Sequence, residues 1–285
     1  MAEMTRDWTT LVQAETLAAA LGNDDLVVVD CRVSLAEPGA GERMWREAHI
    51  PGAMHADLER DLSDMRRADE GRHPWPAAAD FTARLGAWGI SPDSTVVVYD
   101  QGDGAFAARL WFLLRTLGHE SVAVLDGGWA RWTALGLPTD DAVPEPRSAQ
   151  YGGDFDRDRL LDAAQVQARL DAGDVLLDAR AAPRFRGDVE PLDPVAGHVP
   201  GARNHPYASN LEDGRFKPAA QLAAAYREAL GGRDPSSAIA MCGSGVTACH
   251  LLLAMEHAGM PGAKLFTGSW SGWIADPSRP VATGD

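Results

Sequence analysis

The sequence has few cysteines, little positive charge and no long apolar run. Its three cysteines are Cys31, Cys242 and Cys249, and their spacing fits neither a Cys-x-x-Cys metal site nor a disulfide framework. So few cysteines favour a reducing compartment. No apolar stretch reaches membrane-spanning length, and no basic start, long apolar core and cleavage site mark the N-terminus as a secretory signal. We therefore expect a cytoplasmic protein that does not bind membranes.

The charge balance is strongly acidic. The chain has 41 Asp and Glu residues against 26 Lys and Arg residues, a formal net charge of −15. Binding to nucleic acid depends on basic side chains that neutralise phosphates, so we exclude nucleic acid as a partner. An anionic substrate would be repelled at long range and would need a local cluster of positive groups to hold it.

The sequence repeats itself once, which predicts two related domains. Three segments of the first half recur in the second half in the same order. They are "LVVVDCR" and "VLLDAR", "EAHIPGA" and "AGHVPGA", and "DGGWARW" and "TGSWSGW". The polar segment 139–153 is typical of a linker. We therefore predict an N-terminal domain over residues 1–140 and a C-terminal domain over residues 154–285.

Within each half, short apolar strands alternate with helical patterns. The predicted strands are Leu26–Asp30, Thr95–Tyr99, Val122–Leu125, Val175–Asp178, Ala238–Met241 and Lys264–Phe266. The predicted helices include Ala105–Leu117, Leu160–Ala172, Pro218–Leu230 and Val246–Gly259. This alternation indicates an α/β fold in which each domain is a parallel sheet flanked by helices. Ligands of such sheets bind beyond the carboxyl ends of the strands, which is where Cys242 lies.

The stretch "AIAMCGSGVTACHLLLAM" predicts a reactive cysteine. Gly243 and Gly245 allow the backbone after Cys242 to curl into a nest of inward-pointing N–H groups. The following helix directs the positive end of its dipole at the same place, so the thiol should ionise easily and act as a nucleophile. The equivalent position in the first half is Asp100, which predicts one catalytic domain and one inactive domain.

Two other classes of protein compete with this interpretation. A cysteine phosphatase also holds a thiolate in a strand–loop–helix nest, but it needs an arginine six residues after the cysteine, where this chain has Ala248. A non-catalytic binding module with the same fold is the other alternative. The intact cysteine loop speaks against it.

The tandem halves, the "HIPGA" and "HVPGA" motifs, "DGGW" and "GSW", and above all "CGSGVTA" resemble the two-domain rhodanese-type sulfurtransferases. The loop looks like that of the 3-mercaptopyruvate sulfurtransferases within this family. The resemblance implies that sulfur passes from 3-mercaptopyruvate, or from thiosulfate, to a persulfide on Cys242. A small thiol, cyanide or thioredoxin would then accept it. No metal or organic cofactor is needed.

The resemblance also implies roles for further residues. Arg184 matches the family's substrate arginine, Arg180 is expected to support it, and four loop residues complete the donor site: Gly243, Gly245, Val246 and Thr247. Ser244, His73 and Asp61 match the serine, histidine and acid proposed to act together in mercaptopyruvate-type members. This chain departs from the family where a second arginine is common. It has Leu192 and Asp193 there, which leaves the choice between mercaptopyruvate and thiosulfate open.

Overall fold

The computed structural model describes residues 8–285, and these form two compact units. The first unit contains the described residues up to Ser63, together with Pro76–Asp156 and Asp213–Arg215. The second unit contains Asp64–Trp75, Arg157–Glu212 and Phe216–Asp285. The segment Asp64–Trp75 therefore lies in the N-terminal half of the sequence and in the second unit of the structure. The predicted division at residues 140 and 154 stays a prediction.

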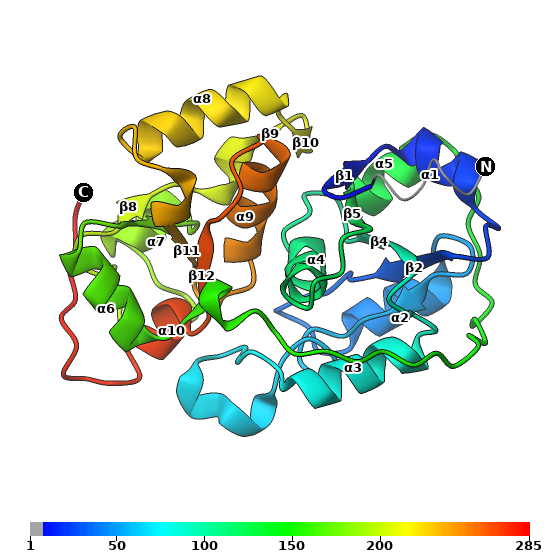
Figure 1. Cartoon of the computed structure of the whole chain (residues 1–285), viewed down its shortest axis with the longest axis horizontal. Coiled ribbons are helices and arrows are strands. Elements are labelled where there is room, and N and C mark those ends of the chain that lie inside the picture. The colour runs from blue at the N-terminus through cyan, green and yellow to red at the C-terminus, as the bar shows by residue number, and fades with distance from the viewer. Residues whose placement is uncertain (1–7) are drawn as a thin grey trace. The chain divides into compact units, whose positions relative to one another are not determined.

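Each unit is built on a parallel five-stranded sheet (Figure 1). In the first unit the strand order is β1 (Leu11–Val12), β5 (Val122–Leu125), β4 (Thr95–Tyr99), β2 (Leu26–Asp30) and β3 (Met54–His55). In the second unit it is β6 (Leu160–Leu161), β12 (Lys264–Phe266), β11 (Ala238–Met241), β7 (Val175–Asp178) and β8 (Arg203–Asn204). Every pairing within these two sheets is parallel, which confirms the predicted fold class.

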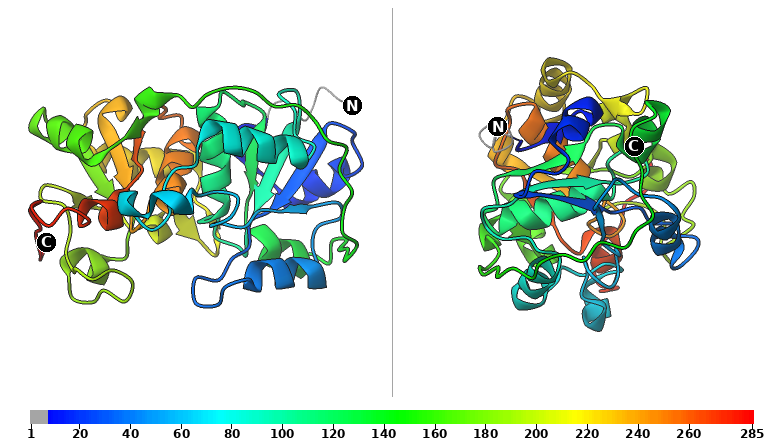
Figure 2. Two further views of the ribbon diagram at one scale, coloured as in Figure 1. Left: turned by 90° about the horizontal axis from the view of Figure 1, so that it is seen from below. Right: turned by 90° about the vertical axis from the view of Figure 1, so that its right-hand side faces the viewer.

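Helices cover both faces of each sheet (Figure 2). The first unit has α1 (Ala14–Ala20), α2 (Ala40–Glu47), α3 (Ala78–Ala87), α4 (Ala107–Thr116) and α5 (Gly128–Ala134). The second has α6 (Ala163–Asp171), α7 (Ala182–Arg186), α8 (Ala219–Ala229), α9 (Ala248–His257) and α10 (Ser269–Trp273). A short hairpin, β9 (Leu211–Glu212) and β10 (Arg215–Phe216), and several 3₁₀ turns complete the chain. Among residues 8–285, no helix has the length and hydrophobicity needed to span a bilayer.

The cores explain why these segments are strands. All five residues of β4 and all four of β11 are buried, as expected for central strands covered on both faces. In the second unit, one face of the sheet packs on α6 and α10 through a cluster of buried side chains: Val166, Leu176, Ile239, Met241, Phe266, Trp270 and Trp273. The other face carries α9, on which α8 packs. The buried sheets form rigid platforms for the loops that leave their strands.

The register of the two sheets confirms the equivalence of Asp100 and Cys242. Asp30 lies opposite Tyr99 in the first sheet, and Asp178 lies opposite Met241 in the second. The next residue along the chain is Asp100 in one unit and Cys242 in the other. Both therefore leave their sheets at the carboxyl end of a central strand.

The six predicted strands have the bounds that the sequence indicated, and the four predicted helices are each present and slightly shorter. The edge strands β1, β3, β6 and β8 were not predicted, because two residues are too few to show a pattern. Leu160–Leu161 is a strand rather than the start of a helix, because Asp162 forms a capping box with Gln165 and begins α6 after it.

Candidate functional site

Cys242 stands in the loop between β11 and α9 in the second unit, with 2% of its surface exposed. The N–H of Gly245 donates a hydrogen bond to Sγ of Cys242 at 3.2 Å, so at least one loop amide points inward. Gly245 has a φ of 78°, in the left-handed region that favours glycine. The sulfur is buried beside polar groups, as the proposed nest requires. The expected ease of ionisation of this thiol stays a prediction.

The turn before α10 is hydrogen-bonded to the start of the cysteine loop. The N–H of Cys242 donates to Oγ of Ser269 at 3.1 Å, and Oγ of Ser269 donates to the carbonyl of Phe266 at 3.0 Å. The N–H groups of Trp270 and Ser271 donate to the carbonyls of Cys242 and Gly243 at 3.0 and 2.9 Å. Ser269 is fully buried and has a φ of 50°, which is rare for a residue with a side chain. This backbone strain lies directly against Cys242.

Ser244 and His73 are in contact. Nδ1 of His73 lies 2.7 Å from Oγ of Ser244, and both side chains are buried. The contact forms because the segment Asp64–Trp75 folds within the second unit. Asp61 belongs to the first unit, where its carboxylate pairs with Arg60 and Arg84 at 3.0 Å each. The role of Asp61 beside His73 stays a prediction.

Arg184 lies beside the residue that follows the cysteine. A β-carbon placed on Gly243 would lie 3.4 and 3.6 Å from Nη2 and Nη1 of Arg184. Two buried acids hold this guanidinium: Oε1 of Glu190 at 2.7 Å and Oδ2 of Asp193 at 3.3 Å. Burial opposes ionisation of Glu190, but hydrogen bonds from Arg184 and from the backbone outweigh it and lower the pKa of the carboxyl. Both acids thus fix the position of Arg184.

Arg180 shares Glu190 with Arg184, since its Nη1 lies 3.5 Å from Oε2 of that acid, but its other contacts differ. Its Nη2 pairs with Oδ2 of Asp178 at 2.7 Å, it donates to the carbonyl of Gly197 at 2.8 Å, and it lies 4.8 Å over the ring of Trp270. Its side chain is 1% exposed. The same arrangement recurs in the first unit, where Arg32 pairs with Asp30 and lies over Trp129. Because the first unit, which has Asp100 in place of Cys242, has the same arrangement, it supports the fold of both units; contact of Arg180 with a donor stays a prediction.

Arg72 is a second guanidinium at the cysteine loop that the sequence analysis missed. A β-carbon placed on Gly243 would lie 2.8 Å from Nη2 of Arg72. Nη1 of the same side chain pairs with Asp193. Two features of the sequence could have pointed to Arg72. It precedes His73 in "GRHPWP", and position 193 has an acid where the sequence analysis expected an arginine.

The remaining loop residues lie close to the cysteine without a polar side-chain contact to it. Val246 is buried, and Thr247 is partly buried directly before α9 begins at Ala248. Cys249 is fully buried in α9, and its thiol lies 3.4 Å from the carbonyl of Gly245. Contact of Val246 and Thr247 with a donor stays a prediction.

The equivalent loop of the first unit is filled by Asp100. Its carboxylate accepts hydrogen bonds from four backbone N–H groups at 2.9 to 3.1 Å, those of Gly102, Gly104, Phe106 and Ala107. Burial raises the pKa of Asp100, and the nearby carboxylate of Asp103 adds to the effect. The loop of the first unit therefore forms a nest of amides, which the side chain of Asp100 occupies.

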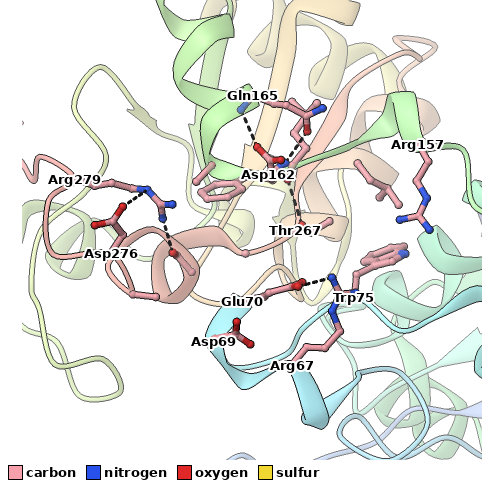
Figure 3. Close-up of a pocket in the computed structure, with 17 residues that line it drawn as sticks. Arg67, Asp69, Glu70, Trp75, Arg157, Asp162, Gln165, Thr267, Asp276 and Arg279 are labelled. Carbon is pink, nitrogen blue, oxygen red and sulfur yellow. Dashed lines mark hydrogen bonds and ion pairs between the residues drawn. The ribbon is translucent and has the colours of Figure 1, made fainter.

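A separate cavity of about 590 Å³ in the second unit contains none of the predicted site residues (Figure 3). It lies between α10, the start of α6 and the 3₁₀ helix Met65–Glu70, and Trp75 lines one wall. Acids neighbour two of its arginines: Arg67 pairs with Glu70, and Nε of Arg279 lies 3.7 Å from Asp276. The carboxylates that line the cavity outnumber the three arginines there, so its net charge does not favour an anion: Asp69, Glu70, Asp162 and Asp276.

A rhodanese-like domain model matches the chain twice, over residues 13–135 and 162–276. The chain belongs to the rhodanese-like family. A Pseudomonas aeruginosa protein, provisionally named 3-mercaptopyruvate sulfurtransferase, is 52% identical over 279 residues that cover 96% of this chain and 98% of the relative. A Mycobacterium tuberculosis protein, provisionally named thiosulfate sulfurtransferase SseB, is 40% identical over 281 residues that cover 96% and 97%.

The fold comparison agrees with this membership. The crystal structure of the rhodanese-fold protein SseA from Escherichia coli matches with a TM-score of 0.79 at 32% identity, over 92% of this chain and 99% of SseA. The predicted resemblance to the tandem rhodanese-type sulfurtransferases is confirmed. The predicted enzyme class, a sulfurtransferase, is confirmed with it, which sets aside the non-catalytic binding module.

Proposed function

We propose that this sulfurtransferase moves sulfur from 3-mercaptopyruvate through a persulfide on Cys242 to a thiol or cyanide. The observation that carries the proposal is the position of the Arg184 guanidinium beside Gly243, one residue after the buried thiol. A planar guanidinium binds a carboxylate through two parallel hydrogen bonds. A donor held there by its carboxylate would bring its sulfur to the cysteine.

The first half-reaction transfers the sulfur to the enzyme. The thiolate of Cys242 attacks the sulfur of 3-mercaptopyruvate, and a sulfur–sulfur bond forms while the carbon–sulfur bond breaks. The electron pair of the broken bond leaves with the carbon as the enolate of pyruvate, which takes up a proton. The donor carbon is reduced and the transferred sulfur is oxidised, so no external oxidant or cofactor is required.

Ser244 and His73 are placed to handle the proton. Their side chains are 2.7 Å apart, and Ser244 lies in the cysteine loop. A histidine can give and accept protons near neutral pH, and the serine hydroxyl extends its reach by one hydrogen bond. We assign the pair the protonation of the leaving enolate. The role that the family resemblance implies for Asp61 stays a prediction, since its carboxylate pairs with Arg60 and Arg84 in the first unit.

The second half-reaction releases the sulfur. An acceptor thiolate or cyanide attacks the outer sulfur, and the electron pair of the sulfur–sulfur bond returns to Cys242 as its thiolate. The products are a new persulfide or thiocyanate. The two displacements should show ping-pong kinetics. Thioredoxin is a candidate acceptor because its paired thiols can take the sulfur and release it as sulfide.

Mass spectrometry and kinetics test the proposal. Incubation with 3-mercaptopyruvate should add one sulfur to Cys242, and a reducing agent should remove it; the Cys242→Ala variant should gain none. The Arg184→Ala variant should lose about 10- to 100-fold in kcat/KM, as expected for one charge-assisted contact. Arg186→Ala is the matched control, because Arg186 pairs with the exposed Asp188 and faces solvent. A wild-type protein that gains no sulfur would refute the proposal.

Thiosulfate is the second candidate donor. The relative from Mycobacterium tuberculosis carries its name, and the two guanidinium groups at Gly243 also suit a compact dianion. A comparison of kcat/KM for the two donors decides between them. A preference for thiosulfate in the wild type would replace mercaptopyruvate as the donor and leave the persulfide on Cys242 in place.

A further inference from the structure

We propose that Arg72 is a specificity-determining residue that anchors the anionic end of the sulfur donor together with Arg184. The inference rests on the proposed function and adds a residue that comes from a separate segment of the chain. The sequence lacks the second arginine common in the loop before "HVPG", where it has Leu192 and Asp193. The structure assigns to Arg72 the role of the second guanidinium that binds the donor.

The guanidinium of Arg72 reaches from an acid on one side to the cysteine loop on the other. Nη1 pairs with Oδ1 of Asp193, whose side chain is 2% exposed. Nη2 faces Gly243, where an added β-carbon would lie at 2.8 Å. Arg184 also borders Gly243: its Nη2, which pairs with Glu190 and Asp193, would lie 3.4 Å from the same β-carbon, and its Nη1 would lie 3.6 Å from it. The two arginines therefore present N–H groups to the same residue.

Asp193 connects the two arginines. Its Oδ1 pairs with Arg72 and its Oδ2 lies 3.3 Å from Arg184, so one carboxylate fixes the spacing of both groups. The acid therefore holds an arginine from a separate segment of the chain beside the cysteine loop.

The backbone of Arg72 is fastened to the elements that hold the cysteine. Its N–H donates to Oγ of Ser271 at 3.0 Å, and the N–H of Ser271 donates to the carbonyl of Gly243 at 2.9 Å. Gly71 lies so close to the turn before α10 that a β-carbon on it would lie 2.9 Å from the carbonyl of Gly268. Figure 2 shows the 3₁₀ helix Met65–Glu70 beside α10. The backbone that carries the Arg72 guanidinium is therefore held in place beside the cysteine loop.

The chemistry of the pair favours a donor with two adjacent acceptor groups. 3-Mercaptopyruvate has a carboxylate and a keto oxygen on neighbouring carbons. Two guanidinium groups that flank one residue can bind the carboxylate bidentately and the keto oxygen at the same time. Arg72 has 30% of its side chain exposed and Arg184 has 19%, so both are accessible to a small anion.

The test compares Arg72→Gln with Arg66→Gln. Arg66 lies on the same segment, pairs with Asp64 and is 71% exposed, which makes it a matched control. We expect Arg72→Gln to raise KM for 3-mercaptopyruvate about 10- to 100-fold and Arg66→Gln to change it less than about twofold. Arg72→Lys keeps the charge without the planar fork and should recover part of the loss.

A binding measurement separates anchoring from a merely structural role. Pyruvate carries the same carboxylate and keto oxygen and no sulfur, so it can be titrated calorimetrically into the unreactive Cys242→Ser protein. We expect Cys242→Ser/Arg72→Gln to bind pyruvate about tenfold more weakly than Cys242→Ser at an unchanged melting temperature. Unchanged pyruvate affinity and unchanged KM would overturn the inference.

The same measurements distinguish this inference from the proposed function. A wild-type protein that forms no persulfide from 3-mercaptopyruvate refutes the proposed function, whatever Arg72 does. Pyruvate binding to the Cys242→Ser protein still decides whether Arg72 anchors such an anion. A persulfide that forms normally while Arg72→Gln leaves KM and pyruvate binding unaltered refutes the inference alone.

Discussion

Replacement of Ser269 tests whether backbone strain is maintained to hold the cysteine. Ser269 has a φ of 50°, and its hydroxyl accepts the N–H of Cys242 at 3.1 Å. The equivalent residue in the first unit is Gly128, which has the same φ of 50° and no side chain. The chain thus uses glycine at this bend where the loop carries no cysteine, and a strained serine where it does. We compare Ser269→Ala, which keeps a β-carbon, with Ser269→Gly, which removes it.

Both variants lose the hydrogen bond, but only one keeps the strain. A buried N–H without a partner costs about 1–3 kcal/mol, so Ser269→Ala should lower the free energy of unfolding of the second unit by that amount. A left-handed conformation costs a residue with a β-carbon about 1–2 kcal/mol, which glycine avoids. The greater chain entropy of glycine offsets part of the gain. Ser269→Gly should therefore be about 1 kcal/mol more stable than Ser269→Ala.

Urea unfolding followed by circular dichroism measures the stability difference, and sulfur transfer from 3-mercaptopyruvate to cyanide measures the activity. We expect both variants to lose kcat by a similar factor, since both release the amide of Cys242, and to differ in stability. Ser269→Thr, which keeps a hydroxyl, should retain more activity than either. If Ser269→Ala proves as stable as Ser269→Gly, the strain argument is wrong. If kcat is unchanged in both, the hydroxyl does not position the cysteine.

Three further predictions concern the buried ion pairs, the pH dependence of stability and the inactive loop. Arg180→Ala should lower the free energy of unfolding by about 3–5 kcal/mol because it leaves Asp178 buried without its counter-charge. Arg32→Ala should lower the free energy of unfolding by the same amount and leave KM for the donor unchanged. A loss below about 1 kcal/mol in urea unfolding would contradict the prediction for either variant. Burial lowers the pKa of three histidines, His55, His119 and His205. Below about pH 6.5 these histidines take up protons in the unfolded chain before they do so in the folded protein. The free energy of unfolding, measured from pH 7 downward, should therefore fall by up to about 1.4 kcal/mol per pH unit for each histidine. A free energy of unfolding that does not change with pH would contradict this. The double variant Asp100→Cys/Cys242→Ala should transfer no sulfur in the cyanide assay, because the carboxylate of Asp103 beside that position opposes ionisation of a thiol there.

The sequence was sufficient for the central strands of both sheets and for the place of Cys242 at the carboxyl end of one of them. Leu26–Asp30 and Val175–Asp178 are continuous apolar runs that end in an acid, so their bounds followed from composition alone. The reactivity predicted for Cys242 rests on the Gly-Ser-Gly and the helix that follow it directly, and it stays a prediction. These features are local in sequence, and local features are what a single sequence reveals best. The edge strands β3 and β8 have two residues each and depend on pairing with a neighbour, which no local pattern records.

The arginines show where sequence reasoning reaches its limit. Arg180 and Arg184 both follow β7 within a few residues, yet one is held on Asp178 and Trp270 while the other faces Gly243. The difference arises because Arg180 folds back on its own strand end and Arg184 lies one turn into α7. Arg72 comes from another segment of the chain, and tertiary contacts with Gly268, Ser271 and Asp193 bring it to the loop. Contacts between segments that are far apart in the sequence leave no local pattern from which they could be predicted.

The filled loop of the first unit shows how the second could hold a persulfide. Gly104 and Gly245 are equivalent, since each has a positive φ shortly before its helix and donates its N–H to the residue at the strand end, Asp100 or Cys242. The carboxylate of Asp100 also reaches the N–H groups where α4 begins. A carboxylate oxygen and the outer sulfur of a persulfide are both two bonds from the β-carbon. The outer sulfur should therefore reach the corresponding amides where α9 begins.

This correspondence predicts that Cys242→Asp is inactive yet more stable than Cys242→Ala. An aspartate in the second loop should accept the amides that the persulfide would use, whereas alanine leaves them without a partner in a buried site, at a cost of about 1–3 kcal/mol for each buried group. Both variants lack a nucleophile, so any difference in urea unfolding reports on the loop alone. If Cys242→Asp is the less stable of the two, the amides of the second loop do not converge on the end of the side chain, and the outer sulfur would need another group to stabilise it.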